Sequence, residues 1–350
     1  MNFDYGNARL RAMKARLLTA EQLNVLATAR NLSAFIAELS RTSYHHAADV
    51  AAARGADITV LTALLRIHIV ETMGHIRAFY DGEAQTRVAR LLEQYDTHNV
   101  KTILRGLEQH VSQDEIQTAL IPVGELTSAV LSQMIRSNDV HAAVDTLASL
   151  GYSAAHPLLD LRARHPGAAV WEMELALERW YLLPERWPQD GSAMQRKREI
   201  DADLLNLMTM LRFAHAPVER TQMSDLLHIE LTDLLVPVGQ VPESKLIQIG
   251  SASSVADAIA MLENTAYATA LDEGFQHYRS NHLLSSIERE LRRYRLRQAR
   301  ASYVGDPLGI GVPIGYLAQK ANEIGMVRAI AWGVHQGLGA AAIQQRVEFV

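Results

Sequence analysis

The sequence predicts a nearly all-α protein, and three observations support this prediction. Long intervals without proline are rich in leucine, alanine, glutamate and arginine, which favour helices. Valine and isoleucine recur every three or four residues, and the alternation at every second residue that predicts a strand is hard to find. A pattern of apolar residues ending in a tyrosine also occurs three times, and a repeat of this length usually sets the architecture of a chain.

Three segments show helical spacing most clearly. Apolar residues trace one helix face in residues 61–79, and a second helix includes Trp171 and Leu175. A third helix is predicted in residues 282–300, where Leu291 belongs to the apolar face. The ten prolines cluster at the joints between such segments.

Composition narrows the range of functions. The chain has 350 residues, of which 48% are hydrophobic and 21% charged, as in a globular protein with a substantial core. Its net charge of −5 argues against a dedicated nucleic-acid binder, and the absence of cysteine excludes disulfides and thiolate chemistry. No apolar run is long enough for a transmembrane helix, and residues 1–18 lack the apolar stretch of a signal peptide. We expect no cofactor and no metal, and at most a peripheral attachment to a membrane.

The repeated pattern places four residues at offsets of 0, 14, 21 and 26. Its copies are Leu18, Leu32, Leu39 and Tyr44; Leu126, Val140, Leu147 and Tyr152; and Val241, Val255, Leu262 and Tyr267. Two copies directly follow a Pro-Val-Gly tripeptide, which runs from Pro122 to Gly124 and from Pro237 to Gly239. Because proline fixes φ and glycine permits positive φ, this tripeptide predicts a corner after a helix.

A second repeated stretch precedes each tripeptide. Residues 99–105 (NVKTILR) match residues 206–212 (NLMTMLR), and a weaker third copy runs from 326 to 332. The segment that would complete the third copy lies at the other end of the chain, in residues 18–44. The sequence thus indicates a third unit that is built from both chain ends.

Three equivalent units with joined ends favour a closed pseudo-threefold ring over an open solenoid, which normally has distinct caps. The expected units are residues 45–155, residues 156–270, and residues 271–350 together with 1–44. Each tyrosine of the pattern is expected to pack its ring and bond its hydroxyl at a joint between units. Arg105 and Arg212 are likewise expected to hold contacts between units.

Three further patterns resemble ligand or catalytic sites, and each has a structural explanation. The glycine-rich run 309–315 follows no strand and lacks the Lys-Ser/Thr ending of a P-loop, so it predicts a connector. His68, Glu71 and His75 share a helix face without the spacing of the His-Glu-x-x-His zinc motif. They fit an ordinary amphipathic helix, with a metal-dependent hydrolase as the alternative. No Gly-x-Ser-x-Gly sequence supports a serine nucleophile.

The strongest charge feature is a run of arginines between residues 289 and 300. The arginines expected to face a partner are Arg289, Arg292, Arg293 and Arg297. Such a helix fits an acidic protein, anionic lipid headgroups or RNA, or a solvated face paired with Glu288 and Glu290. A free-standing helical scaffold that binds a peptide or an RNA through this helix is therefore one hypothesis for function.

Three segments, in order along the chain, resemble a known family. They are residues 5–18 (YGNARLRAMKARLL), 95–105 (YDTHNVKTILR) and 306–317 (DPLGIGVPIGYL), the last followed by Asn322-Glu323 and Val327-Arg328. The chain resembles the C subunit of bacterial and archaeal V/A-type rotary ATPases, which is similar to the d subunit of the eukaryotic vacuolar enzyme. It departs from the family after Glu323, where a common asparagine is missing, and in an insert at residues 181–197.

The resemblance implies a funnel of three similar helical units without a catalytic site, attached peripherally on the cytoplasmic side of the membrane. The implied partners are the central shaft, made of the D and F subunits, and the rotor ring of proteolipids, with the stator membrane subunit as a further candidate and no nucleic acid. The implied role is to transmit torque between ATP synthesis or hydrolysis and ion transport. Neither the transported ion, H⁺ or Na⁺, nor the direction of the ATP reaction follows from this chain.

Overall fold

The described part of the chain is helical. The structure, a computed structural model, describes residues 2–216 and 230–346, and these ranges contain helices and turns but no β-strand. The prediction of an all-α fold is confirmed. The α-helices are α1 (Asp4–Lys14), α2 (Ala20–Ala27), α3 (Leu32–Leu39), α4 (His45–Ala53), α5 (Ile58–Gly74), α6 (Gly82–Glu108), α7 (Gln113–Ala119), α8 (Ser128–Ile135), α9 (Val140–Ser149), α10 (His156–Arg164), α11 (Val170–Leu182), α12 (Ala193–His215), α14 (Glu243–Gly250), α15 (Val255–Ala260), α16 (Ala268–Asn281), α17 (Ser285–Gly305), α18 (Gly311–His335) and α19 (Ala340–Arg346). Short 3₁₀ helices are η1 (Ile76–Phe79), η2 (Ser153–Ala155), η3 (Pro184–Arg186) and η4 (Leu231–Leu234).

The helices expected from apolar spacing are present, with shifted ends. α5 and η1 together cover residues 61–79, and α11 contains Trp171 and Leu175. The third helix, α17, begins at residue 285 rather than 282, because His282 takes a left-handed conformation (φ 57°) that ends the preceding helix.

Each copy of the sequence pattern also marks the start of a short helix. The second apolar position of the pattern is the first residue of α3, α9 or α15. The residue before it is Asn31, Asp139 or Ser254, and its side chain accepts a hydrogen bond from the backbone N–H three residues further on, at 2.9, 2.8 and 3.1 Å. Different polar residues thus perform the same capping role, which the apolar pattern alone does not reveal.

The three repeats share one packing scheme. We call α6 to α9 with Tyr152 the first repeat, α12 to α15 with Tyr267 the second repeat, and α18 with α2, α3 and Tyr44 the third repeat. In each, one long helix packs against two short helices: α6 against α8 and α9, α12 against α14 and α15, and α18 against α2 and α3. The third repeat therefore joins segments from opposite ends of the sequence.

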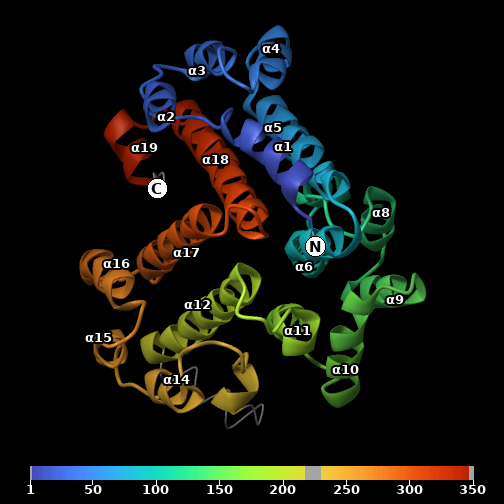
Figure 1. Cartoon of the computed structure of the whole chain (residues 1–350), viewed down its shortest axis with the longest axis vertical. Coiled ribbons are helices and arrows are strands. Elements are labelled where there is room, and N and C mark those ends of the chain that lie inside the picture. The colour runs from blue at the N-terminus through green and yellow to red at the C-terminus, as the bar shows by residue number, and fades with distance from the viewer. Residues whose placement is uncertain (1, 217–229, 347–350) are drawn as a thin grey trace. The chain divides into compact units, whose positions relative to one another are not determined.

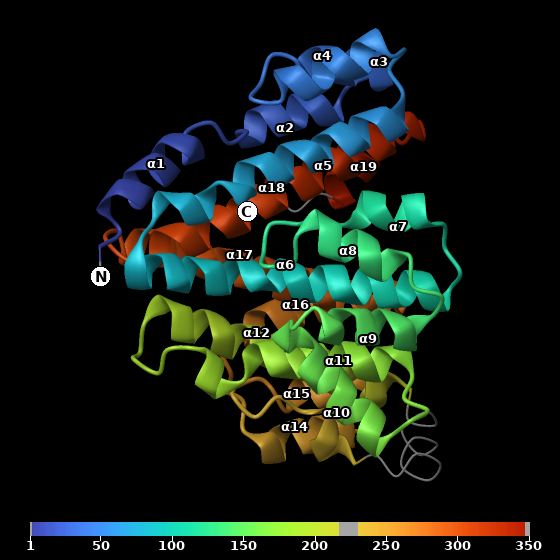
Figure 2. The same ribbon diagram turned by 90° about the vertical axis from the view of Figure 1, so that its right-hand side faces the viewer.

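The chain forms two compact parts, residues 1–174 with 302–350, and residues 175–301. In the first part, α1, α2, α3 and α5 pack against α18, as Figures 1 and 2 show. Asn7 Nδ2 donates a hydrogen bond of 3.0 Å to the carbonyl oxygen of Gly309 in the same region. The N-terminal residues therefore complete the packing around the C-terminal long helix, and the division into three units remains a prediction.

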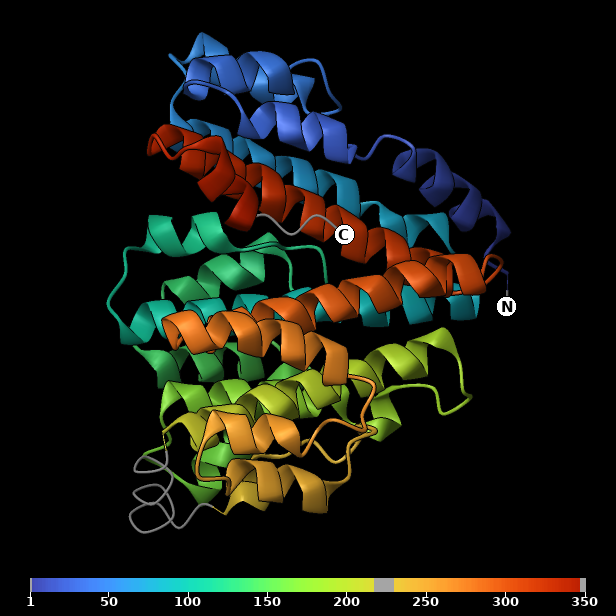
Figure 3. The ribbon, with the colours of Figure 1, turned by 90° about the vertical axis from the view of Figure 1, so that its left-hand side faces the viewer.

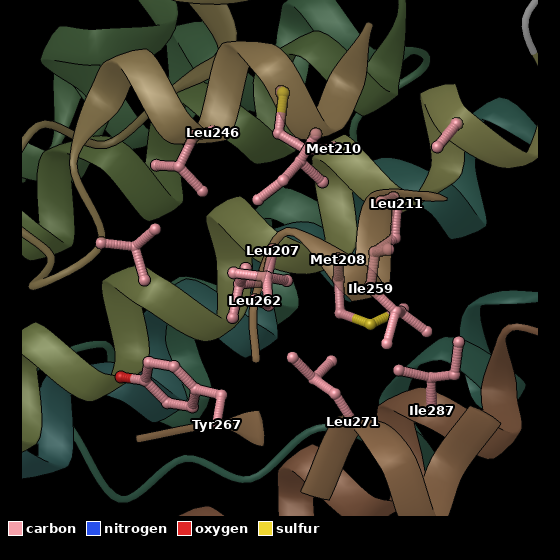
Figure 4. Packing of buried hydrophobic residues seen from close by; sticks show 14 of the residues in the cluster. Leu207, Met208, Met210, Leu211, Leu246, Ile259, Leu262, Tyr267, Leu271 and Ile287 are labelled. Atoms are coloured by element: carbon pink, nitrogen blue, oxygen red, sulfur yellow. The ribbon is translucent and has the colours of Figure 1, made fainter. Parts of the chain in front are cut away.

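In the second part, α12 shares an apolar core with α14 to α17. Leu207 and Leu262 are fully buried in it, and Leu271 and Ile287 continue the same cluster (Figure 4). The expected unit boundary at residue 270 falls inside α16 and inside this core. Apolar spacing along a single helix does not show which neighbouring helices it packs against, so this position of the boundary could not be judged from the sequence.

Candidate functional site

A buried carboxylate on the long helix binds the backbone of each repeat, and we call this arrangement the carboxylate clasp. In the second repeat, Asp203 accepts hydrogen bonds from the backbone N–H groups of Gln240 and Val241, at 2.9 and 3.1 Å. In the first repeat, Asp96 accepts them from Glu125 and Leu126, at 2.7 and 3.0 Å. The clasp therefore fixes the backbone at the first position of the apolar pattern, just before α8 or α14 begins.

An asparagine three residues after each aspartate holds the same connection on its other side. Asn99 donates to the carbonyl oxygen of Ile121 and accepts from its N–H, at 2.9 and 2.7 Å. Asn206 makes the same two bonds with Val236, both at 2.8 Å. Because a primary amide presents a donor and an acceptor together, one side chain satisfies both backbone groups of the bound residue.

The Pro-Val-Gly tripeptide lies between these two anchors. The valine N–H bonds the carbonyl oxygen two residues back, at 2.9 Å in both copies, which makes a three-residue turn centred on Pro122 or Pro237. The predicted corner is present, but the reason given for its glycine is wrong, because neither Gly124 nor Gly239 has a positive φ. A Cβ at either position would overlap the carboxylate of Asp96 or Asp203. The glycine is required because the backbone approaches a buried acid closely.

The clasp of the third repeat is built differently. Glu323 on α18 accepts a hydrogen bond from the backbone N–H of Leu18 and another from the hydroxyl of Tyr44, the latter at 2.6 Å. Lys320 Nζ lies 2.9 Å from both Glu323 Oε1 and the Tyr44 hydroxyl, and 3.3 Å from Nε2 of His68. Lys320 and Glu323 are each about 3% exposed, so this cluster is a buried ion pair with two aromatic neighbours.

The tyrosines of the pattern fall into two groups. Tyr267 is fully buried and donates to Asp203 at 2.7 Å, as Tyr44 donates to Glu323. Both bonds lie within a predicted unit, and their role at joints between units remains a prediction. Tyr152 is half-buried, and its hydroxyl forms no hydrogen bond with any residue that the structure describes. The first repeat therefore lacks the tyrosine bond that the other two have.

Burial changes the acidity of these groups. It raises the pKa of Asp203, and it raises the pKa of the Tyr267 hydroxyl, with the neighbouring Asp203 adding to the effect. Burial also lowers the pKa of Lys320, whereas Glu323 acts to raise it. The pKa of His68 falls to about 4, first because of burial and second because of the charge of Lys320. We therefore expect His68 to be neutral beside Lys320 at physiological pH.

Asp96 should make stability depend on pH. Burial raises its pKa to about 7, although its two backbone N–H bonds act in the opposite direction. Between about pH 4 and pH 7 the folded chain keeps a proton that the unfolded chain has released, so the free energy of unfolding falls as pH rises. Asparagine does not titrate, so the Asp96→Asn variant should lose this contribution. Between about pH 4 and pH 7 its free energy of unfolding should fall by up to about 4 kcal/mol less than that of the unaltered chain. Urea unfolding of both proteins at several pH values measures how the free energy of unfolding depends on pH. The same dependence in both proteins would contradict the prediction.

The structure places Arg105 and Arg212 differently, and their role in contacts between units remains a prediction. Arg105 donates two hydrogen bonds to Glu174, which links α6 to α11, while Arg212 is exposed. Of the arginines on α17, Arg289 and Arg293 pair with the buried Glu290, at 3.2 and 2.9 Å. The exposed members are Arg292 and Arg297. Half of the expected partner surface is therefore engaged by its own helix, and its binding role remains a prediction.

The two histidines that the sequence offered as metal ligands, His68 and His75, contact different partners. His68 contacts Lys320, whereas His75 contacts the backbone carbonyl oxygen of Glu71 through Nδ1, at 2.6 Å. Within residues 2–216 and 230–346, no three histidine, cysteine, aspartate or glutamate side chains are grouped so that they could hold a metal ion. The geometry gives no support to a metal-dependent hydrolase.

Sequence reasoning missed the acids of the clasp, although a signal was available. Asp96 and Asp203 each stand three residues before a repeated asparagine, and Glu323 stands three residues before Met326 in the weak third copy. Extended by three residues toward the N-terminus, each of the three copies begins with an acid. Lys320 had no such signal, because the corresponding residues, Glu93 and Ile200, are not basic.

These features define a class of protein: a helical-repeat subunit whose repeated polar residues bind its own backbone. The family model of the ATP synthase (C/AC39) subunit matches residues 6–346, and the chain belongs to this family, a non-catalytic subunit of V/A-type rotary ATP synthases. The expectation of a subunit without a catalytic role is confirmed by this relationship. Within the described residues, no helix combines the length and apolar character needed to cross a bilayer.

Relatives of the chain occur in bacteria and archaea, where they are the C subunits of ATP synthases. The C subunit of the V-type ATP synthase of Deinococcus radiodurans is 24% identical over 99% of this chain and 91% of its own length. The C subunit of the A-type ATP synthase of Pyrococcus abyssi is 24% identical over 99% of this chain and 90% of its own length. That of Methanosarcina acetivorans is 26% identical over 99% and 92%.

Proposed function

We propose that this subunit joins the central shaft, which consists of the D and F subunits, to the proteolipid ring on the cytoplasmic side of the membrane. In this role it carries torque between the ATP-synthesising or ATP-hydrolysing head and the ion-transporting membrane sector. The family relationship supports the assembly, and the repeated carboxylate clasp is the observation that supports the mechanical role.

A part that carries torque must resist shear between its helices. In all three repeats a side chain of the long helix, Asp96, Asp203 or Glu323, binds the backbone just before a short helix that packs on it, namely α8, α14 or α2. Inside a protein, hydrogen bonds are weakened less by solvent than at the surface, and those to a carboxyl group are strongest when it is ionised. The repeats therefore resist sliding of the short helices along the long ones.

The packing of both chain ends serves the same purpose. Because α1, α2 and α3 lie against α18, the N-terminal segment is held by the C-terminal long helix. Three repeats of one design, the third assembled from both ends, support a closed pseudo-threefold funnel that receives the foot of the shaft. The arginine helix as a peptide or RNA site gains no support, since Glu290 already neutralises part of it.

Reconstitution tests this proposal. Complexes assembled with and without the chain, from a tagged D subunit, the F subunit, the head and the proteolipid ring, are compared in vesicles. With the chain, the ring should co-purify with the tagged shaft and ATP should drive ion uptake. Without it, the head should still hydrolyse ATP, while ring recovery and ion uptake are lost. Full coupling without the chain, or failure of the chain to join shaft or ring, would overturn the proposal.

A further inference from the structure

The first compact part exposes apolar side chains and cations on α1 and beside the turn that leads into α18. Tyr5 on α1, Val304 in the last turn of α17, and Leu308 in the turn before α18 are 63%, 75% and 71% exposed. Single exposed apolar residues are ordinary, but several in one place mark interaction surfaces. We call these three residues, together with Arg9, Arg11 and Lys14 of α1, the α1 edge.

Specific contacts hold α1 against the turn before α18. Arg11 donates a hydrogen bond to the carbonyl oxygen of Pro307, and Nζ of Lys14 lies 4.0 Å from the centre of the Tyr303 ring. The Asn7 side chain bonds Gly309, two residues before α18 begins, and Figure 3 shows α1 beside this turn. Leu308 is therefore exposed on a turn that α1 anchors, and Val304 is exposed just before it.

The cations of the α1 edge keep their charge available. Arg9 lies over the ring of Phe79 at 4.5 Å, while Arg11 and Lys14 contact a carbonyl oxygen and a ring. None of the three forms an ion pair with a carboxylate among the residues that the structure describes. Other surface arginines of this compact part do, such as Arg41 with Glu38.

Two acidic groups lie nearby and do not cancel this charge. Asp4 begins α1, where a carboxylate interacts favourably with the helix N-terminus. Asp306 accepts a hydrogen bond of 2.9 Å from the backbone N–H of Gly311 and so serves the turn itself. α1 carries three cations against one carboxylate, on a chain whose net charge is −5.

We propose that the α1 edge binds an anionic lipid surface. Val304 and Leu308 would enter the boundary between headgroups and acyl chains, Tyr5 would lie at headgroup level, and the three cations would contact lipid phosphates. Side chains that are 71–75% exposed project from the surface instead of lining a groove, which suits insertion into a deformable lipid layer. The inference goes beyond the proposed coupling, because it assigns to this protein a contact with lipid rather than with another protein.

Vesicle co-sedimentation of the full chain tests the proposal. Vesicles of phosphatidylcholine alone are compared with vesicles containing about one third phosphatidylglycerol, at low and at physiological salt. The chain should bind the anionic vesicles at least tenfold more tightly, and less tightly as salt rises. The variant Val304→Ser/Leu308→Ser should lose about tenfold in affinity. Arg9→Gln should lose about fivefold.

Matched variants from the same compact part serve as controls. Ile67→Ser replaces a side chain that is 45% exposed on α5, and Arg30→Gln removes an exposed cation outside the α1 edge. Both should bind vesicles as the unaltered chain does. Equal binding to neutral and anionic vesicles, or equal losses in the control and α1-edge variants, would overturn the proposal.

Co-purification with shaft and ring, measured on the same variants, separates this inference from the proposed function. Lost vesicle binding with intact assembly supports a lipid contact. Intact vesicle binding with lost ring recovery overturns it and assigns the α1 edge to a protein partner. Vesicle binding by a chain that joins neither shaft nor ring supports the lipid contact and overturns only the coupling role.

Discussion

Replacing Lys320 with methionine is expected to lower the free energy of unfolding by about 3 to 5 kcal/mol. The substitution keeps the length of the side chain and removes its charge. Glu323 would then be a buried carboxylate without its cation, and the Tyr44 hydroxyl would lose one of its two partners. Because this cluster joins α18 to residues near the other chain end, the third repeat should open at lower urea concentration.

A second variant and a control separate lost charge pairing from lost packing. In Lys320→Met/Glu323→Gln neither partner is charged, so this double variant should recover much of the lost stability. Arg41→Met breaks the exposed pair with Glu38 on α3 and should cost at most about 0.5 kcal/mol. Urea unfolding at pH 7 compares the three proteins. A Lys320→Met effect as small as that of Arg41→Met would contradict a stabilising role for the buried cation.

Replacing Gly239 with alanine should lower the free energy of unfolding by about 3 kcal/mol. The added methyl group would overlap Oδ1 of Asp203. That carboxylate is held by two backbone N–H groups and by Tyr267, so it cannot move aside without losing hydrogen bonds. Gly124→Ala meets Asp96 in the same way and should behave alike.

Gly325→Ala is the matched control for these substitutions. Gly325 lies within α18, is exposed, and has nothing within 4 Å of the position that a Cβ would take. Alanine favours a helix over glycine, so this variant should gain about 1 kcal/mol. Thermal or urea unfolding measures all three proteins. A Gly239→Ala variant as stable as the unaltered chain would contradict the prediction, because it would show that the backbone at position 239 can move away from the Asp203 carboxylate at little cost.

The repeats were predictable because they lie in the core. Leu39, Leu147 and Leu262, the third apolar positions of the three copies, are all fully buried, and core positions restrict side-chain type most strongly. Tyr44 and Tyr267 are equally buried, which explains why a tyrosine ends the pattern in these copies. Periodicity and spacing thus yielded the helical class and the match between the two chain ends.

Other features depend on contacts that spacing does not encode. Lys320 and Tyr44 are 276 residues apart in sequence, and only folding brings them together. The need for glycine at position 239 comes from an acid on another helix, so the tripeptide alone suggested a different reason. The α1 edge could not be predicted, because the sequence does not show that the apolar residues Val304 and Leu308 are exposed in the folded chain.

The unequal clasps of the repeats have a mechanical consequence. If the chain carries torque as proposed, elastic strain should be greatest where the fewest hydrogen bonds oppose it, because local opening is favoured in the least stabilised parts of a fold. Among the residues that the structure describes, Asp96 accepts hydrogen bonds from two backbone N–H groups and from no tyrosine, whereas Asp203 and Glu323 each accept one from a tyrosine hydroxyl. The segment from α6 to α9 would then be the most compliant of the three repeats. Since the pKa of Asp96 lies at about 7, the stiffness of this repeat would change with the proton concentration around the protein.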